Sequence, residues 1–551
     1  MSYQAVFTGW EDLKLKDLLV AYRKAKADCF FENTFPTAVK FAEYEQKLLP
    51  NLKKLLEKLK KDNGFFENEK FLGQYRVVPK KLIINKKSDT NSISHVHFSD
   101  PKKNLNKLFG ENEINPSFRI IGDFPVETHI ISALWINMVG EQFDERLTES
   151  CYGARLKRIE NDEEFSLNMR KPFHISAIGS FTPYFQPYQK WRNDGLNAIR
   201  DELEKDKSVI AVSLDLKSYY HYIDPKIIVS ENLHKTFDLT LSEHELLFTK
   251  QLANFLEEWA KQAVVFSKKI SVECEISGGL AIGLTASRII SNMILHRWDK
   301  LIKEKVTPIH YGRYVDDMFL VLKDAGNISN SDDLMKFLRE RIGDEILKPD
   351  DKDPKKWLIN QPNSKNDSTL IQLQSDKQKL FLLEGRTGLD LLDSIEKDIY
   401  ELSSEHRLMP SPDQLDQSTA AKVLSAAGSV GENADTLRRA DGLTIRRLSW
   451  ALQLRHVETL ARDLPSKVWK KQRDEFYQFA HNHILRPDSI FEHFSYLPRL
   501  LGFAISLNEW HQAELIVLRA YQSLDLLKAA IFDQDRSKFY GEVNGAKCDL
   551  H

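Results

Sequence analysis

Two segments near the N-terminus have apolar residues at the spacing of an amphipathic helix. Residues 12–26 and residues 41–59 both alternate leucines with lysines near helical period. Pro50 falls inside the second segment, where it is expected to break or kink the helix. We therefore expect residues 1–70 to form a helical region whose main role is packing.

The pattern changes after this region, because strand-like and helical stretches alternate. Residues 75–84 are rich in β-branched and basic residues, whereas residues 85–106 are polar and loop-like. Residues 209–214, Val-Ile-Ala-Val-Ser-Leu, form a continuous apolar run that is typical of a buried strand. Residues 240–265 have the pattern of one long helix, and residues 371–383 that of two short strands around a polar turn.

From about residue 390 onward, the strand pattern disappears and helical spacing returns. Trp450, Leu454 and Val457 are spaced by four and three residues, and a second apolar stripe runs beside them, so this helix is expected to be buried on two sides. The basic stretch 438–473 could face phosphates, although a charged run is more often a solvated helix face. The helices could form a HEAT-like array, but no strong repeated motif supports one.

Together, these patterns predict an α+β protein with a helical region at residues 1–70, a mixed region at 71–390 and an all-α region at 391–551. The formal net charge of −2 does not favour a nucleic-acid partner, but it is compatible with one if the charges are segregated. The four cysteines form no CxxC pair, so neither a zinc site nor a disulfide framework is indicated. We expect a cytoplasmic protein without a membrane span.

A pair of acidic residues stands between two β-prone runs. Residues 309–315 and 318–322 are rich in aromatic, β-branched and apolar residues, and Asp316 and Asp317 separate them. This pattern is typical of a tight hairpin in which the two acids form the turn. An Asp-Asp pair at such a position is commonly only a turn. A divalent cation would also explain it, because hard cations prefer carboxylate oxygens.

A third acid gives the pair a chemical interpretation. Asp215 directly follows the apolar strand at residues 209–214, a position that suits a metal ion better than burial. A small-residue loop at residues 277–287 lies between this strand and the hairpin, where a substrate base or phosphate could rest against the backbone. Two-metal phosphoryl transfer uses carboxylates from separate strands to hold two ions about 4 Å apart. The three acids therefore predict a two-metal centre.

In their order and spacing, these motifs are similar to those of the reverse transcriptase family, and the resemblance covers roughly residues 70–390. The matching residues are Asp215 with Tyr220, Ile282-Gly283 with Ser287 and Ser291-Asn292, Tyr314-Val315-Asp316-Asp317, Arg119, Tyr152-Gly153-Ala154-Arg155 and Lys377. The resemblance implies a right-hand polymerase whose fingers and palm combine an antiparallel sheet with helices. It also implies a nucleotidyltransferase that adds dNTPs to a DNA product.

The resemblance gives each motif an expected role. Asp215, Asp316 and Asp317 would bind Mg²⁺, with Mn²⁺ as an alternative. Tyr220 would act as a sugar gate whose ring clashes with a ribose 2′-hydroxyl. A glycine beside Arg155 would let the backbone and the guanidinium approach a triphosphate. The residues expected to bind substrate are Tyr220, Arg155, Lys80, Gly283, Ser287 and Lys377.

The helical C-terminal part and the aromatic, basic segment at residues 183–192 most resemble the abortive-infection (Abi) and other defence-associated reverse transcriptases of bacteria. This resemblance implies either synthesis without a template from a protein primer, or copying of a companion non-coding RNA. Ile282 replaces the usual glutamine of the second palm motif, which favours untemplated synthesis. The segment 183–192 could stack on bases or pack a helix onto the core.

A different class of function is a silent scaffold that keeps the palm but only binds RNA or a partner protein. The three acids argue against this alternative, because packing alone does not require them. The apolar helical flanks favour self-association into a homo-oligomer.

Overall fold

The computed structural model describes residues 6–30, 37–61, 69–86, 101–159, 172–183, 185–269, 279–324, 326, 328–351, 353, 356–360, 370–373, 378–393 and 447–532. Two compact units share the chain. The first comprises Met1–Tyr75, Ile121–Val265 and Glu275–Leu392, and the second comprises Arg76–Ile120, Phe266–Cys274 and Asp393–His551. The described residues form helices and antiparallel sheets, which confirms the predicted mixture of both. The boundaries expected at residues 70 and 390 stay predictions.

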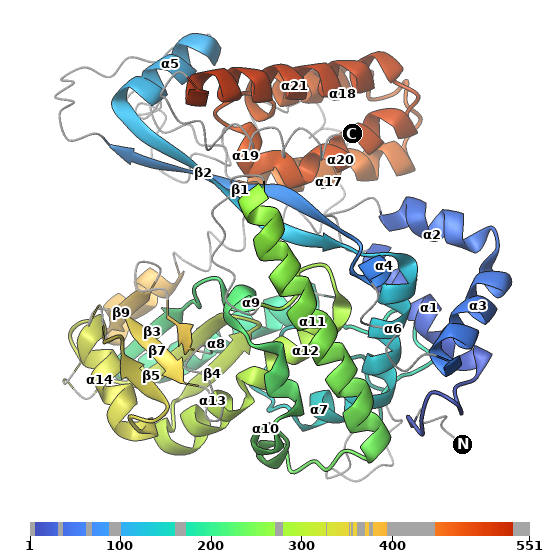
Figure 1. The fold of residues 1–551 in the computed structure, drawn as a ribbon. Coiled ribbons are helices and arrows are strands. Elements are labelled where there is room, and N and C mark those ends of the chain that lie inside the picture. The colour runs from blue at the N-terminus through green and yellow to red at the C-terminus, as the bar shows by residue number, and fades with distance from the viewer. Residues whose placement is uncertain are drawn as a thin grey trace. The chain divides into compact units, whose positions relative to one another are not determined.

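Helices begin the first unit (Figure 1). They are α1 (Leu15–Phe30), α2 (Thr37–Glu45), α3 (Leu48–Lys61) and α4 (Glu69–Leu72). Both predicted helical segments are present, but the second is divided at residues 46–47, ahead of Pro50. Pro50 instead lies in the first turn of α3, where its missing N–H removes no hydrogen bond from the helix.

The middle of the first unit is largely helical. Its helical elements are α6 (Val126–Trp135), η2 (Ile136–Gly140), α7 (Glu141–Arg146), α8 (Phe185–Leu203), α9 (Tyr219–Tyr222), η3 (Pro225–Val229), α10 (Glu231–Thr236), α11 (Glu243–Lys269), α12 (Thr285–Ile294), α13 (His296–Leu301) and η4 (Ile302–Val306). The helix predicted at residues 240–265 is α11. Both α1 and α12 pack against α6, which joins the N-terminal helices to the centre of the unit.

A four-stranded antiparallel sheet in the order β4-β5-β3-β9 organises the described part of the first unit. Its strands are β3 (Val209–Leu214), β4 (His310–Tyr314), β5 (Asp317–Lys323) and β9 (Lys379–Leu383). The strand predicted at residues 209–214 is confirmed as β3. Its Val-Ile-rich sequence suits a central position, because β5 and β9 cover both of its edges.

Helix α8 covers one face of this sheet. A Cβ atom at Gly195 would lie 2.2 Å from the Phe319 ring, so this glycine lets α8 approach β5 closely. Trp191 is buried and packs against Tyr314 with ring centroids 6.1 Å apart. Residues 183–192 were expected either to stack on bases or to pack a helix onto the core. Trp191 packs a helix onto the core.

A second, three-stranded antiparallel sheet follows in the first unit. It contains β6 (Leu347–Pro349), β7 (Trp357–Asn360) and β8 (Leu370–Gln372), and α14 (Ser331–Ile342) precedes it. The two strands predicted within residues 371–383 are present as β8 and β9. They join different sheets, because β8 pairs with β7 whereas β9 pairs with β3.

The second unit combines a β-ribbon with C-terminal helices. Strands β1 (Gln74–Lys86) and β2 (Asn112–Asp123) pair with each other, and most of their residues belong to this unit. Between them, α5 (Pro101–Glu111) makes the last part of the loop expected at residues 85–106 helical. The C-terminal helices are α17 (Arg447–Asp463), α18 (Lys470–Phe479), η8 (Ala480–Ile484), α19 (Ile490–His493), η9 (Phe494–Tyr496), α20 (Leu497–Ser506) and α21 (Trp510–Phe532).

Aromatic side chains form the core of these C-terminal helices. Trp450 stacks on Phe476 with centroids 5.2 Å apart, and the predicted stripe of Trp450, Leu454 and Val457 is buried. Arg473 is also buried and forms a 2.7 Å ion pair with Glu509, so this end of the basic stretch faces the interior of the unit. A HEAT-like arrangement stays a prediction. Within the described ranges, every helix is too short or too polar to cross a membrane.

Buried histidines predict how the stability of the fold depends on pH. Burial lowers the pKa of His129 and of His296 from 6.5 to about 4. Between these values the unfolded chain binds more protons, so stability is complete above about pH 6.5 and falls as the pH approaches 4.

His296 stacks on Phe237 with centroids 4.1 Å apart, so His296→Phe keeps the ring contact and removes the titration. Urea denaturation should show that this variant loses about 2 kcal/mol less stability than the wild type between pH 7 and pH 5. An identical pH dependence in both proteins would contradict this prediction.

Candidate active site at the end of the central sheet

The predicted acidic hairpin is present as β4 and β5, but its turn is shifted by one residue. Tyr314 pairs with Asp317, so the two turn residues are Val315 and Asp316 instead of the two aspartates. Val315 has a φ of +59°, in the left-handed region that β-branched residues rarely adopt. A strained residue therefore precedes Asp316, and such strain persists only where neighbouring structure enforces it.

The strand register brings Asp215 to the same end of the sheet. Leu214, the last residue of β3, pairs with Met318 of β5, and Asp215 follows directly after Leu214. Adjacent strands lie about 4.8 Å apart, so the backbone at Asp215 lies beside that of Asp317. Asp215 and Asp316 are half-buried, whereas Asp317 is exposed.

The chemistry of these side chains suits a hard divalent cation, because carboxylate oxygens are its preferred ligands. Among the described residues, no group of three or more His, Cys, Asp or Glu side chains is close enough together to hold a metal ion. The three aspartates thus share one end of the sheet without forming a preassembled three-carboxylate cluster. A cation held here would rely on Asp215 and Asp316, the two half-buried carboxylates.

Tyr220 lies next to the turn. Burial, with a contribution from the negative charge of Asp316, raises the pKa of Tyr220 to about 12. Its hydroxyl lies 3.3 Å from the Ser291 Oγ, and the neighbouring Tyr219 hydroxyl donates to the Ser291 carbonyl at 2.6 Å. Helix α12 therefore fixes both tyrosines through one residue, and the Tyr220 ring is held close to Asp316.

The small-residue loop before α12 packs against the same tyrosine. The Leu280 N–H donates to the Tyr220 carbonyl at 2.5 Å, and a Cβ at Gly279 would lie 3.1 Å from that oxygen. Gly283 has a φ of +101°, which favours glycine. Ser287 is fully buried, and its Oγ has no hydrogen-bond partner among the described residues. The loop therefore packs directly against the backbone of Tyr220.

Arg155 has partners inside the fold. Its guanidinium donates to the Asp144 carboxylate at 3.1 Å and to the backbone carbonyls of Asp144, Thr148 and Cys151. The expected triphosphate contact stays a prediction for this residue. Gly153 also lies against the turn, because a Cβ there would lie 2.8 Å from the backbone nitrogen of Val315, and its expected approach to an anion stays a prediction. The glycine is therefore required by the strained turn.

Three other predicted residues belong to the second unit or lie outside the described residues. Lys80 is an exposed residue of β1, and Arg119 is an exposed residue of β2, both in the second unit. Lys377 lies outside the described residues. Their proposed contacts to nucleotides stay predictions.

Sequence reasoning missed a buried polar network beneath the turn. Arg313 and Asp299 form a fully buried ion pair, with the Arg313 Nη2 2.7 Å from the Asp299 Oδ2. The signal in the sequence was a charged residue between the apolar positions Tyr311 and Tyr314 of a strand. Such a residue must be paired if it is buried, but the sequence does not identify its partner.

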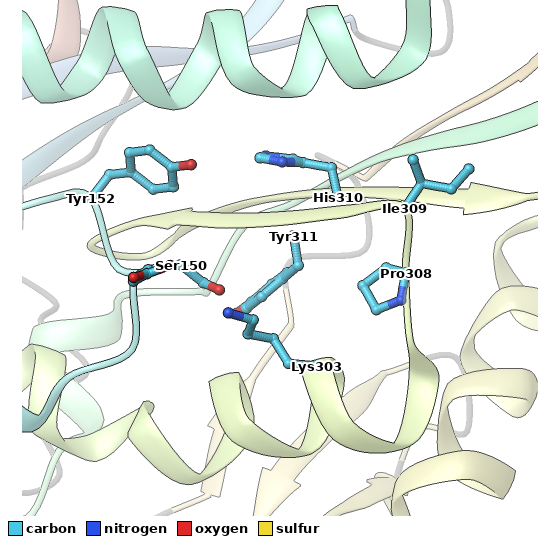
Figure 2. A pocket seen from close by; sticks show the side chains of 8 residues that line it. Ser150, Tyr152, Lys303, Pro308, Ile309, His310 and Tyr311 are labelled. Carbon is cyan, nitrogen blue, oxygen red and sulfur yellow. The ribbon is translucent and has the colours of Figure 1, made fainter. Parts of the chain in front are cut away.

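A cavity of about 260 Å³ opens at the outer edge of β4. Its described lining residues are Glu149, Ser150, Tyr152, Lys303, Pro308, Ile309, His310 and Tyr311. Figure 2 shows Tyr152 and His310 on one side of the strand and Tyr311 on the other. The three aspartates are not part of this lining, so we do not place the reaction in this cavity.

The comparison with protein families agrees with the geometry. Residues 139–347 match the family model described as reverse transcriptase (RNA-dependent DNA polymerase). The matched range contains the three aspartates, Tyr220, Arg155, Gly283 and Ser287, but neither Lys80 nor Lys377. No curated protein matches the chain. Residues 139–347 are therefore similar to a reverse transcriptase domain, and this similarity supports a nucleotidyltransferase that acts on nucleotides and nucleic acid.

Proposed function

We propose that this protein is a DNA polymerase in which Asp215 and Asp316 hold two Mg²⁺ ions and Asp317 assists. The observation that carries the proposal is the register of β3 and β5, which brings all three aspartates to one end of the central sheet. This end of the sheet lies within the residues that match the reverse transcriptase family. Mn²⁺ is the alternative cation, because it accepts the same oxygen ligands.

The residues around the aspartates have defined tasks in such a reaction. When bound, the cations lower the pKa of the attacking 3′-hydroxyl and stabilise the leaving pyrophosphate. Asp215, which follows the central strand β3, provides one carboxylate, and Asp316 in the turn of the neighbouring hairpin provides the other. Gly279 and Gly283 carry no side chain, and the loop backbone at these two residues, beside Tyr220, is the proposed contact for a nucleotide.

Tyr220 is proposed to select the sugar. Its hydroxyl is held near Ser291, so the ring has a fixed position beside Asp316, where we expect it to clash with a ribose 2′-hydroxyl. Tyr220→Ala should raise the relative use of rNTPs by about a hundredfold, because the steric clash disappears. Tyr220→Phe keeps the ring and should retain the preference for dNTPs. Incorporation assays with paired dNTP and rNTP substrates measure this ratio, and unchanged discrimination in Tyr220→Ala would remove the gate role.

We further propose that the protein acts in bacterial anti-phage defence and synthesises DNA without a template, from a protein primer. The support is the resemblance to Abi reverse transcriptases and the apolar Ile282 at a position where a glutamine usually contacts primer and template. The Ile282 carbonyl accepts a hydrogen bond from the Gly122 N–H at 3.0 Å, so its backbone is tied into the fold. Cytoplasmic location and homo-oligomerisation belong to the same proposal.

The test is incubation of the purified full chain with Mg²⁺ and labelled dNTPs, in the absence of added nucleic acid. Labelled product that protease treatment shifts in a gel indicates protein priming. Product that forms only with co-purified RNA, and disappears after ribonuclease treatment, indicates copying of a companion RNA instead. RNA binding without any incorporation under either condition would replace the proposal with the silent scaffold.

A further inference from the structure

Arg313 occupies a fully buried position directly beneath the candidate active site. Arg313 lies on β4, three residues before Asp316 in the sequence, and its side chain has a relative exposure of 0%. A buried guanidinium has five N–H donors that need partners, because an unpaired buried charge is strongly destabilising. The partners of Arg313 therefore show what this costly residue holds in place.

One half of the guanidinium is held by an aspartate of α13. The Arg313 Nε donates to the Asp299 Oδ1 at 2.9 Å, and the Nη2 donates to the Asp299 Oδ2 at 2.7 Å. Tyr311 donates its hydroxyl to the Asp299 Oδ1 at 2.7 Å as well. This two-point contact fixes the plane of the guanidinium, which a lysine could not reproduce.

The other half of the guanidinium reaches the turn. The Arg313 Nη1 donates to the backbone carbonyl of Val315 at 2.7 Å and to the Asn292 Oδ1 at 3.0 Å. Val315 is the residue with the strained φ of +59°, and it directly precedes Asp316. The hydrogen bond thus acts on the peptide group that sets the direction of the Asp316 backbone.

Asn292 closes this arrangement on the other side of the turn. Its Nδ2 donates to the Gly153 carbonyl at 2.9 Å, and Gly153 lies against the Val315 backbone nitrogen. Arg313 thus holds the Val315 carbonyl, Gly153 lies against the Val315 nitrogen, and Asn292 links Arg313 to Gly153. We call these three residues the turn clamp. Tyr311 is not part of it, because its hydroxyl donates to Asp299, which does not belong to the clamp.

We propose that Arg313 is a positioning residue that holds the strained Val315 peptide, and thereby the Asp316 carboxylate, in the geometry that a divalent cation requires. This inference rests on the proposed function for its catalytic consequence. The physical reason is that the turn stores strain, so without the clamp it should relax and carry Asp316 away from Asp215. Hydrophobic residues could fill the same space, but they could not orient a carbonyl.

The test compares Arg313→Lys with Tyr311→Phe in the full-length protein. Arg313→Lys keeps a charge near Asp299 but loses the fork that reaches Val315, whereas Tyr311→Phe removes a hydrogen bond to the same Asp299 and leaves the clamp intact. In Arg313→Lys, kcat should fall about a hundredfold, the half-saturating Mg²⁺ concentration should rise about tenfold, and the KM for dNTP should change little. Tyr311→Phe should leave the Mg²⁺ dependence unchanged even where it lowers thermal stability.

Two measurements without turnover separate this inference from the proposed function. Hydrogen–deuterium exchange of the peptide containing residues 315–317 should be faster in Arg313→Lys than in Tyr311→Phe, and Mn²⁺ binding followed by electron paramagnetic resonance should be weaker. If the wild type incorporates no nucleotide, the proposed function fails, and these two readouts still decide the positioning role. Unchanged exchange and unchanged Mn²⁺ affinity in Arg313→Lys would overturn it.

Asn292→Ala provides a second variant in case Arg313→Lys does not fold. It removes one acceptor of the Arg313 Nη1 and the tether to Gly153, while Asp299 keeps the buried charge paired. The exchange at residues 315–317 and the Mn²⁺ affinity should change in the same direction as in Arg313→Lys. Wild-type values for both in Asn292→Ala would count against the turn clamp.

Discussion

Asp316→Asn should reduce dNTP incorporation by about three orders of magnitude, because it replaces a metal-binding carboxylate with a neutral amide at the turn. The fold should be almost unaffected, since Asp316 lies at a hairpin tip and is half-buried. Steady-state incorporation of labelled dNTPs at saturating Mg²⁺ measures the loss, and circular dichroism confirms the fold. Full synthesis by this variant would show that the reaction does not depend on the acidic turn.

Asp324→Asn is the matched control. Asp324 follows the opposite end of β5, and its carboxylate accepts a hydrogen bond from the Gly326 N–H at 2.8 Å on the protein surface. This substitution removes the same charge from the same hairpin, far along the strand from the turn. Its incorporation rate should remain within about twofold of the wild type, as is usual for a surface substitution.

Gly153→Ala should produce the second large effect. The added methyl group would lie 2.8 Å from the Val315 backbone nitrogen and 3.0 Å from its Cγ2, and backbone atoms cannot move away cheaply. We expect unfolding free energy to fall by about 1–3 kcal/mol, as in other overpacked sites. Incorporation should fall by about a hundredfold, because the displaced turn carries Asp316 with it.

Gly502→Ala is the control for this glycine substitution. Gly502 lies within α20, and no atom lies within 4 Å of the position that its Cβ would occupy. Alanine should therefore stabilise the helix by about 0.5–1 kcal/mol and leave incorporation unchanged. Urea denaturation and dNTP incorporation of both variants give the comparison. A Gly153→Ala protein with wild-type stability and activity would show that neither stability nor catalysis depends on the close approach of Gly153 to the turn.

Local patterns in the sequence predicted the main elements of the central sheet. The run at residues 209–214 is β3 because its continuous apolar side chains can be buried only in the middle of a sheet. The hairpin around Asp316 was evident for a similar reason, since two β-prone runs flank a short polar turn. Periodicity also located α11 and the stripe at Trp450, and Leu460 of the second expected stripe is buried as well.

Local sequence patterns do not identify partners that are distant in the sequence. The turn is shifted onto Val315 because Tyr314 pairs with Asp317, and β-branched residues are not expected at positive φ. Arg155 looked like a residue for an anion, yet its partner Asp144 lies on α7 and was not recognisable as such. The ion pair of Arg313 and Asp299 joins a strand to a helix through tertiary packing, which no local pattern encodes.

Joint cation binding by Asp215 and Asp316 is proposed to be the basis of nucleotidyl transfer in this protein. Its most direct test is the anomalous scattering of Mn²⁺ in crystals of the full chain soaked with a non-hydrolysable dNTP. We expect Mn²⁺ peaks in direct contact with both carboxylates and with the triphosphate, beside the Tyr220 ring. A triphosphate bound elsewhere, or Mn²⁺ that contacts neither Asp215 nor Asp316, would contradict it.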